Sequence, residues 1–121
     1  MLTVIEKSRL SVKDLRLAVA KDLRQHGDMK FIGFDNIEHA EPDKALGWPA
    51  SGTIFEIIAG SLQKHGAPKE DGYNTLGDVM SGLGYQDKNE AHSAAHWIGC
   101  HCHGEITGDI VADRIEGLNT L

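Results

Sequence analysis

The chain has 121 residues, a formal net charge of −6, 40% hydrophobic residues and 25% charged residues. These values exclude a disordered chain, and the length is near the commonest size of one domain, so we expect a single compact domain over residues 1–121. No apolar run approaches the roughly 20 residues that cross a bilayer, and the apolar start is too short for a signal peptide. We therefore expect a cytoplasmic protein that does not bind membranes.

The charge is unevenly distributed along the chain. Residues 1–30 hold seven Lys or Arg against four Asp or Glu, whereas residues 31–121 hold five against fourteen. An acidic body of this kind disfavours direct binding of DNA or RNA, because neutralising phosphates needs a basic patch. It favours a partner protein with a basic surface; the alternative is an ordinary solvated surface.

The first predicted helix follows Ser11, with Asp14 three residues later in a variant of the capping box, and it ends at Gly27. Apolar residues recur at helical spacing within it: Val12, Leu15, Val19 and Leu23.

Residues 28–50 are the least regular part of the sequence. A short strand is predicted over Lys30 to Phe34, and it could pair with Leu2 to Ile5 in a small sheet. Further along, the pairs Glu41-Pro42 and Trp48-Pro49 should interrupt regular structure, because proline lacks an N–H group and restricts the residue before it.

Four more helices are predicted over residues 54–65, 76–83, 88–103 and 108–116. Each follows a residue able to cap its first turn: Thr53, Thr75, Asp87 and Thr107. Helix 54–65 is apolar around most of its circumference, which indicates a central position. The expected fold is therefore mainly α, an irregular bundle of about five short helices with a small two-stranded sheet near the N-terminus. The alternative is an α+β fold.

The segment NEAHSAAHWIGCHCHGE is the most unusual part of the chain, because it holds four of the seven histidines and both cysteines. His and Cys are the natural ligands of zinc and similar metals. His92 and His96 are four residues apart, so they share one helix face. Cys100, Cys102 and His103 could join the same ion only if the helix breaks near Gly99 and the CHCH segment folds back. These five residues are the candidate metal ligands, and a zinc-type divalent ion is the candidate cofactor.

Two other interpretations of this segment stay open. In the first, no cofactor binds: His96 and Trp97 pack at a half-buried surface and the cysteines fill the core as small apolar residues. In the second, neighbouring histidines lower the pKa of Cys100 or Cys102 and create a nucleophilic thiolate. Two cysteines one residue apart do not form a disulfide framework, so we expect reduced thiols.

Two loops are further candidate sites. Residues 47–53 are rich in glycine and enter a helix, but they lack the phosphate-binding pattern and predict a structural turn. The acidic stretch contains Asp35, Glu38, His39, Glu41 and Asp43. It predicts a solvated surface, and it is also the best candidate for an interaction loop.

No motif in the sequence fixes a reaction, so an enzyme is the less favoured interpretation. The leading hypothesis is a small acidic protein that binds and regulates another protein, by analogy of composition with phage or mobile-element inhibitors of host proteins. The alternative is a metal-binding protein or small metalloenzyme that uses helix 88–103. A homodimer is a third possibility, with a seam formed by Ala91, Ala94, Ala95 and Trp97.

Overall fold

A computed structural model of the protein describes residues 10–32, 37–51, 53–100 and 106–120. Most of these residues are helical, and two short strands form an antiparallel sheet, which confirms the predicted fold class. Within the described residues, no helix is both long and apolar enough to span a membrane. The elements in chain order are α2 (Val12–Arg24), β1 (Lys30–Phe31), the 3-10 turn η1 (Ile37–His39), α3 (Pro42–Leu46), α4 (Ile54–His65), α5 (Leu76–Gly82), α6 (Lys88–Gly99), β2 (Ile106–Thr107), α7 (Gly108–Gly117) and η2 (Leu118–Thr120).

Side-chain caps begin the five longest helices at the predicted positions. In each case the cap oxygen accepts a hydrogen bond from a backbone N–H of the first turn, which no carbonyl within the helix can reach. The capping residues are Ser11, Thr53, Thr75, Asp87 and Thr107.

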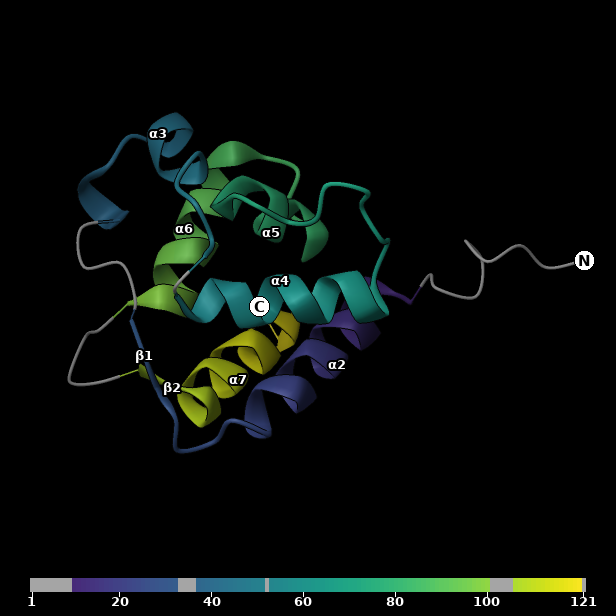
Figure 1. Ribbon diagram of the computed structural model, residues 1–121. Coiled ribbons are helices and arrows are strands. Elements are labelled where there is room, and N and C mark those ends of the chain that lie inside the picture. The colour runs from purple at the N-terminus through teal and green to yellow at the C-terminus, as the bar shows by residue number, and fades with distance from the viewer. Residues whose placement is uncertain (1–9, 33–36, 52, 101–105, 121) are drawn as a thin grey trace, which may run out of the picture.

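Helix α4 lies at the centre of the molecule, as predicted. Figure 1 shows α2 and α7 on one side of α4, and α3, α5 and α6 on the other. Three of its side chains, Phe55, Ile58 and Leu62, have no exposed surface. Because α4 contacts both helix groups, its apolar residues form the middle of one continuous core.

Helices α2 and α7 pack closely because a glycine lies where they meet. A Cβ atom on Gly108 would stand 2.4 Å from the carbonyl oxygen of Leu23. The backbone N–H of Asp109 donates to the carbonyl of Gly27 at 3.2 Å. The contact therefore needs a residue without a side chain at the start of α7.

The sheet differs from the predicted one in its pairing. Strand β1 pairs with β2, with Lys30 opposite Thr107 and Phe31 opposite Ile106. The predicted partner, residues 2–5, lies outside the described residues, as does Phe34. A strand of two residues is too short to show the alternating pattern that identifies strands in a sequence.

The predicted length of α6 was wrong, and the short helix α3 was not predicted, although its start at Pro42 agrees with the predicted interruption at Glu41-Pro42. Helix α3 begins at Pro42, where the missing N–H costs nothing because first-turn N–H groups have no partner within the helix. Helix α6 ends at Gly99 instead of His103, and Cys100 adopts an extended conformation with φ −82° and ψ 132°. The break near Gly99, which the metal hypothesis required, is therefore present.

Candidate functional site

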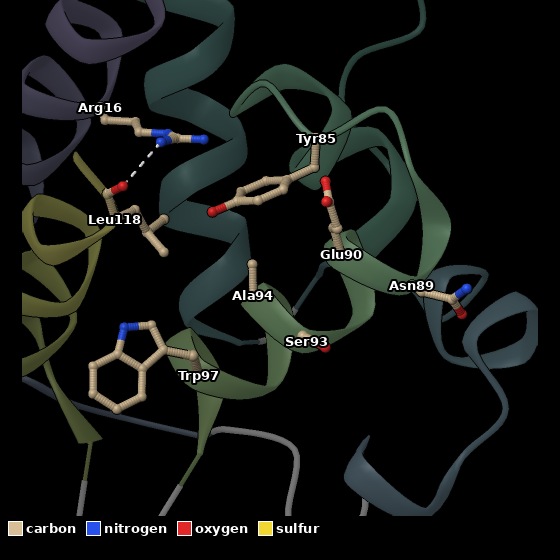
Figure 2. Close-up of a pocket in the computed structure, with 8 residues that line it drawn as sticks. All are labelled: Arg16, Tyr85, Asn89, Glu90, Ser93, Ala94, Trp97 and Leu118. Atoms are coloured by element: carbon tan, nitrogen blue, oxygen red, sulfur yellow. Dashed lines mark hydrogen bonds between the residues drawn. The ribbon is translucent and has the colours of Figure 1, made fainter. Parts of the chain in front are cut away.

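A groove of about 600 Å³ lies in the surface beside α6. Figure 2 shows the residues that surround it. One wall belongs to α6, and the opposite wall combines α2 with the residue that follows α7. The lining residues are Arg16, Tyr85, Asn89, Glu90, Ser93, Ala94, Trp97 and Leu118.

Arg16 positions one wall of the groove by joining the ends of two helices. Its Nε donates to the carbonyl of Leu83 at 2.9 Å, and its Nη1 donates to the carbonyl of Leu118 at 3.4 Å. These residues follow the last turns of α5 and α7, where carbonyl groups lack partners and a positive charge is favoured. The guanidinium also lies over the ring of Tyr85, 4.9 Å from its centroid. The groove wall is therefore fixed by the packing of the fold.

Trp97 forms the other end of the groove, and half of its surface is exposed (50%). The guanidinium of Arg114 lies 5.7 Å from the centre of its ring. Arg114 also donates to the carbonyls of Ile98 and Cys100 at 3.1 and 2.8 Å. Burial lowers the pKa of Arg114, but an arginine remains protonated at neutral pH. The Trp97 ring thus packs against Arg114 and leaves a large aromatic surface open to solvent.

Two hydrogen-bond donors in the groove have no acceptor within the described residues. The hydroxyl of Tyr85 and the indole nitrogen of Trp97 both point toward the space around Ala94 and Leu118 (Figure 2). Ala94 and Leu118 are 7% exposed and form an apolar floor. The groove therefore combines an apolar base with donors aimed into it, which is the usual composition of a ligand site.

The predicted metal-binding histidines both contact η1. Nε2 of His92 donates to the carbonyl of Ile37 at 2.6 Å. Since a carbonyl only accepts, this nitrogen carries a hydrogen and has no lone pair for a metal, which leaves Nδ1. Nε2 of His96 lies 2.5 Å from Oε2 of Glu38, yet it is buried without a well-aligned hydrogen bond. The same carboxylate lies 3.2 Å from Nε2 of His39.

Cys100 is disulfide-bonded, so the expectation of a reduced thiol at this position was wrong. A sulfur atom in a disulfide is not a thiolate, which is the form that binds zinc or attacks a substrate. The chain's other cysteine, Cys102, lies outside the described residues, as does His103. Among the described residues, no three His, Cys, Asp or Glu side chains form a group that could hold a metal ion. The zinc-type site of His92, His96, Cys100, Cys102 and His103 stays a prediction.

The alanines of α6 face the core, so the predicted dimer seam was wrong in this part. Ala91, Ala94 and Ala95 are 4%, 7% and 0% exposed. They form the side of α6 that packs against the rest of the chain. Trp97, the fourth member of that predicted seam, is the one that remains exposed.

A second polar cluster joins α2 to α4. The hydroxyl of Ser61 donates to Oδ2 of Asp22 at 2.7 Å, and Nε2 of His65 lies 3.0 Å from the same oxygen. In a nucleophilic triad the histidine stands between the hydroxyl and the carboxylate. Here the carboxylate stands between the other two groups, so the cluster stabilises the helix pair.

Sequence reasoning singled out Trp97 but missed Arg16 and Tyr85. Their place in the groove depends on how α2, α6 and the end of α7 pack, and no local pattern encodes that contact. Of the acidic stretch, Asp35 lies outside the described residues, and Asp43 forms an ion pair with Lys88 at 3.2 Å.

Comparison with known proteins gives no relative: no family model matches the chain, and no curated protein or solved structure matches it significantly.

Proposed function

We propose that the protein is a non-enzymatic binding protein that holds a segment of another protein in the groove between α6 and Arg16. The observation that carries this proposal is the half-exposed indole of Trp97 at one end of a concave, partly apolar surface. Tryptophan, tyrosine and arginine are the residues that most often dominate binding energy at protein interfaces. All three line this groove: Trp97, Tyr85 and Arg16.

The rigidity of the groove also supports binding. Arg16 and Arg114 hold its sides through hydrogen bonds to backbone carbonyls, and Ala94 is buried in its floor. A site that is already formed loses little conformational entropy when a partner binds, so more of the contact energy appears as affinity. In this proposal the protein acts by binding a segment of the partner and keeping that segment from other contacts, which would suit a regulatory or inhibitory protein.

The chemistry of the partner's surface is a separate expectation. The net charge of −6 favours a partner that is basic outside the contact itself, because opposite charges accelerate association. Such steering is screened by salt. If the partner is basic, the association rate should fall as the salt concentration rises, while the dissociation rate changes little.

The proposal is tested by capture from a lysate of the cells that encode the protein, with wild type and Trp97→Ala immobilised in parallel. Lys64→Ala, in an exposed side chain at the far end of α4, is the matched control. We expect a stoichiometric partner on wild type and on Lys64→Ala. The purified partner should bind Trp97→Ala about 30-fold more weakly, the loss typical of a central interface residue. Equal capture by wild type and Trp97→Ala would contradict the proposal, and so would the absence of any partner.

A further inference from the structure

The groove also has a chemical polarity that indicates what kind of group enters it. At one end lie the guanidinium of Arg16 and the hydroxyl of Tyr85, and at the other end lies the indole of Trp97 (Figure 2). Ala94 and Leu118 form the apolar floor between them. An occupant that matches this surface has an apolar part and, at one end, a group that accepts hydrogen bonds.

The charge of Arg16 favours an anionic acceptor. Within the described residues it forms no ion pair: its contacts are the carbonyls of Leu83 and Leu118 and the ring of Tyr85. These contacts use Nε and Nη1, and no hydrogen bond to Nη2 occurs in the described part of the chain. Arginine presents its N–H groups in a planar fork that suits a carboxylate.

Among the described lining residues, Glu90 is the only carboxylate, and Figure 2 places it beside the Cβ end of Tyr85. The hydroxyl is at the opposite end of the same ring, facing Arg16 and Leu118. The two ends of the Tyr85 ring therefore lie beside groups of opposite charge. An anion is favoured at the Arg16 end and disfavoured at the Glu90 end, which gives the occupant a defined direction.

We propose that the groove binds the C-terminal residue of a partner polypeptide, with its carboxylate at Arg16 and Tyr85 and its apolar side chain on Ala94 toward Trp97. This inference rests on the proposed function and adds the partner's chemistry to it. A chain terminus supplies a carboxylate next to a variable side chain, and its preceding peptide group supplies an acceptor for the indole N–H of Trp97. An internal segment lacks the carboxylate.

The first test uses N-acetyl-leucine and its uncharged twin, N-acetyl-leucinamide, titrated into the full chain labelled with ¹⁵N. The indole N–H signal of Trp97 reports binding in the groove. The signal of Trp48, which follows α3 and does not line the groove, is the internal control. We expect millimolar binding of the acid, with shifts at Trp97 and Ala94, and binding of the amide about tenfold weaker, the loss of one charge-assisted hydrogen bond. Equal binding of both compounds would overturn the carboxylate assignment and leave the proposed function standing.

The second test removes the donors one at a time. Tyr85→Phe keeps the ring that stacks on Arg16 and deletes only the hydroxyl, so it should weaken the acid by about threefold to tenfold and leave the amide unchanged. Lys64→Ala, at an exposed position of α4 outside the groove lining, is the matched control and should change neither affinity. An equal loss for acid and amide in Tyr85→Phe would contradict a contact with the carboxylate.

A third measurement separates a polypeptide terminus from a free carboxylic acid. Hexanoate has a carboxylate and an apolar chain but no preceding peptide group. We expect it to bind more weakly than N-acetyl-leucine. If hexanoate binds more tightly, the groove is a site for a small carboxylic acid and the polypeptide source is wrong. If neither compound shifts the Trp97 signal, the carboxylate inference fails, and the lysate capture then decides the proposed function independently.

Discussion

Nη1 of Arg114 lies 2.8 Å from the carbonyl oxygen of Cys100, the residue at which α6 gives way to extended chain. The same nitrogen donates to the carbonyl of Ile98 at 3.1 Å. One cation on α7 therefore satisfies two carbonyls at the end of α6 that have no partner within that helix. These hydrogen bonds hold the end of α6 against α7 and place the indole of Trp97 next to the Arg114 guanidinium.

Arg114→Met should destabilise the protein by about 2 kcal/mol, because two backbone carbonyls lose a charged donor while the apolar stem is kept. Unfolding in urea, followed by circular dichroism, measures this loss. Arg24→Met is the matched control, because Arg24 on α2 also pairs with side chains of α7. Arg24 forms exposed ion pairs with Asp113 and Glu116, so its replacement should cost about 0.5 kcal/mol. Equal losses in the two variants would show that Arg114 is an ordinary surface arginine.

Two glycines in helices should respond to alanine with opposite signs. A Cβ on Gly99 would stand 2.9 Å from the ring of Phe55, whereas a Cβ on Gly60 would meet no atom within 4 Å. Gly60→Ala should therefore stabilise the protein by about 0.5–1 kcal/mol through helix propensity. Gly99→Ala should destabilise it by about 1–3 kcal/mol through overpacking. Thermal unfolding of both variants checks the signs, and destabilisation by Gly60→Ala would contradict the assignment.

Asp78 should make the free energy of unfolding depend on pH in the acidic range. The hydrogen bond from Lys69 lowers the pKa of this carboxyl, and N–H groups of Asn74 and Thr75 lower it further. Because the pKa is lower in the folded state, the carboxylate stabilises the protein at pH values above about 4, the ordinary pKa of an unfolded Asp. This contribution is lost as the pH falls through the lowered pKa.

Urea unfolding at pH 6 and at pH 3 tests this expectation. Asp78→Asn should lower stability at pH 6, where it removes a helix cap and an ion pair, by about 1 kcal/mol. The difference from wild type should shrink at pH 3. Asp28→Asn, in an exposed side chain, should change stability little at either pH. A constant difference between wild type and Asp78→Asn at both values would exclude the carboxyl group as the cause.

The predicted metal site makes a prediction that depends on redox state. Because Cys100 is disulfide-bonded, zinc binding by the His/Cys segment should require a reductant that first yields thiolates. Elemental analysis of untagged protein, purified with and without a reductant, is the measurement. The metal hypothesis expects about one zinc per chain or per dimer after reduction, and its loss in His96→Ala. Metal far below that level in both preparations, with no effect of chelator on stability, would reject it.

Most helix starts could be predicted because they are local. A Ser, Thr or Asp side chain satisfies N–H groups only two or three residues away, so the sequence window contains the whole interaction. The capping box of Thr75 and Asp78 is the clearest case, since both of its hydrogen bonds form. The central place of α4 followed similarly from its wide apolar surface.

The features that were missed depend on contacts between distant segments. Strand β1 pairs with residues far along the chain, and Arg16 reaches Leu118, 102 positions away. The end of α6 was predicted four residues late because His and Cys have no strong preference against helix. Its actual end is fixed by Arg114 from α7 and by the close approach of Gly99 to Phe55. Neither determinant lies in the local sequence.

The pairing of α2 with α7 has a consequence for how the chain matures during synthesis. Arg24 on α2 and its partner Asp113 on α7 are separated by 89 positions, and the backbones meet at Gly108. While a ribosome is still making the middle of the protein, the apolar side of α2 has no permanent cover. Contacts between residues so far apart in the chain slow folding, and the apolar surface of α2 stays exposed to solvent until they form. We therefore expect chaperones to bind nascent chains that are stalled on the ribosome before residue 108. We expect them to dissociate once the completed chain is released and folds.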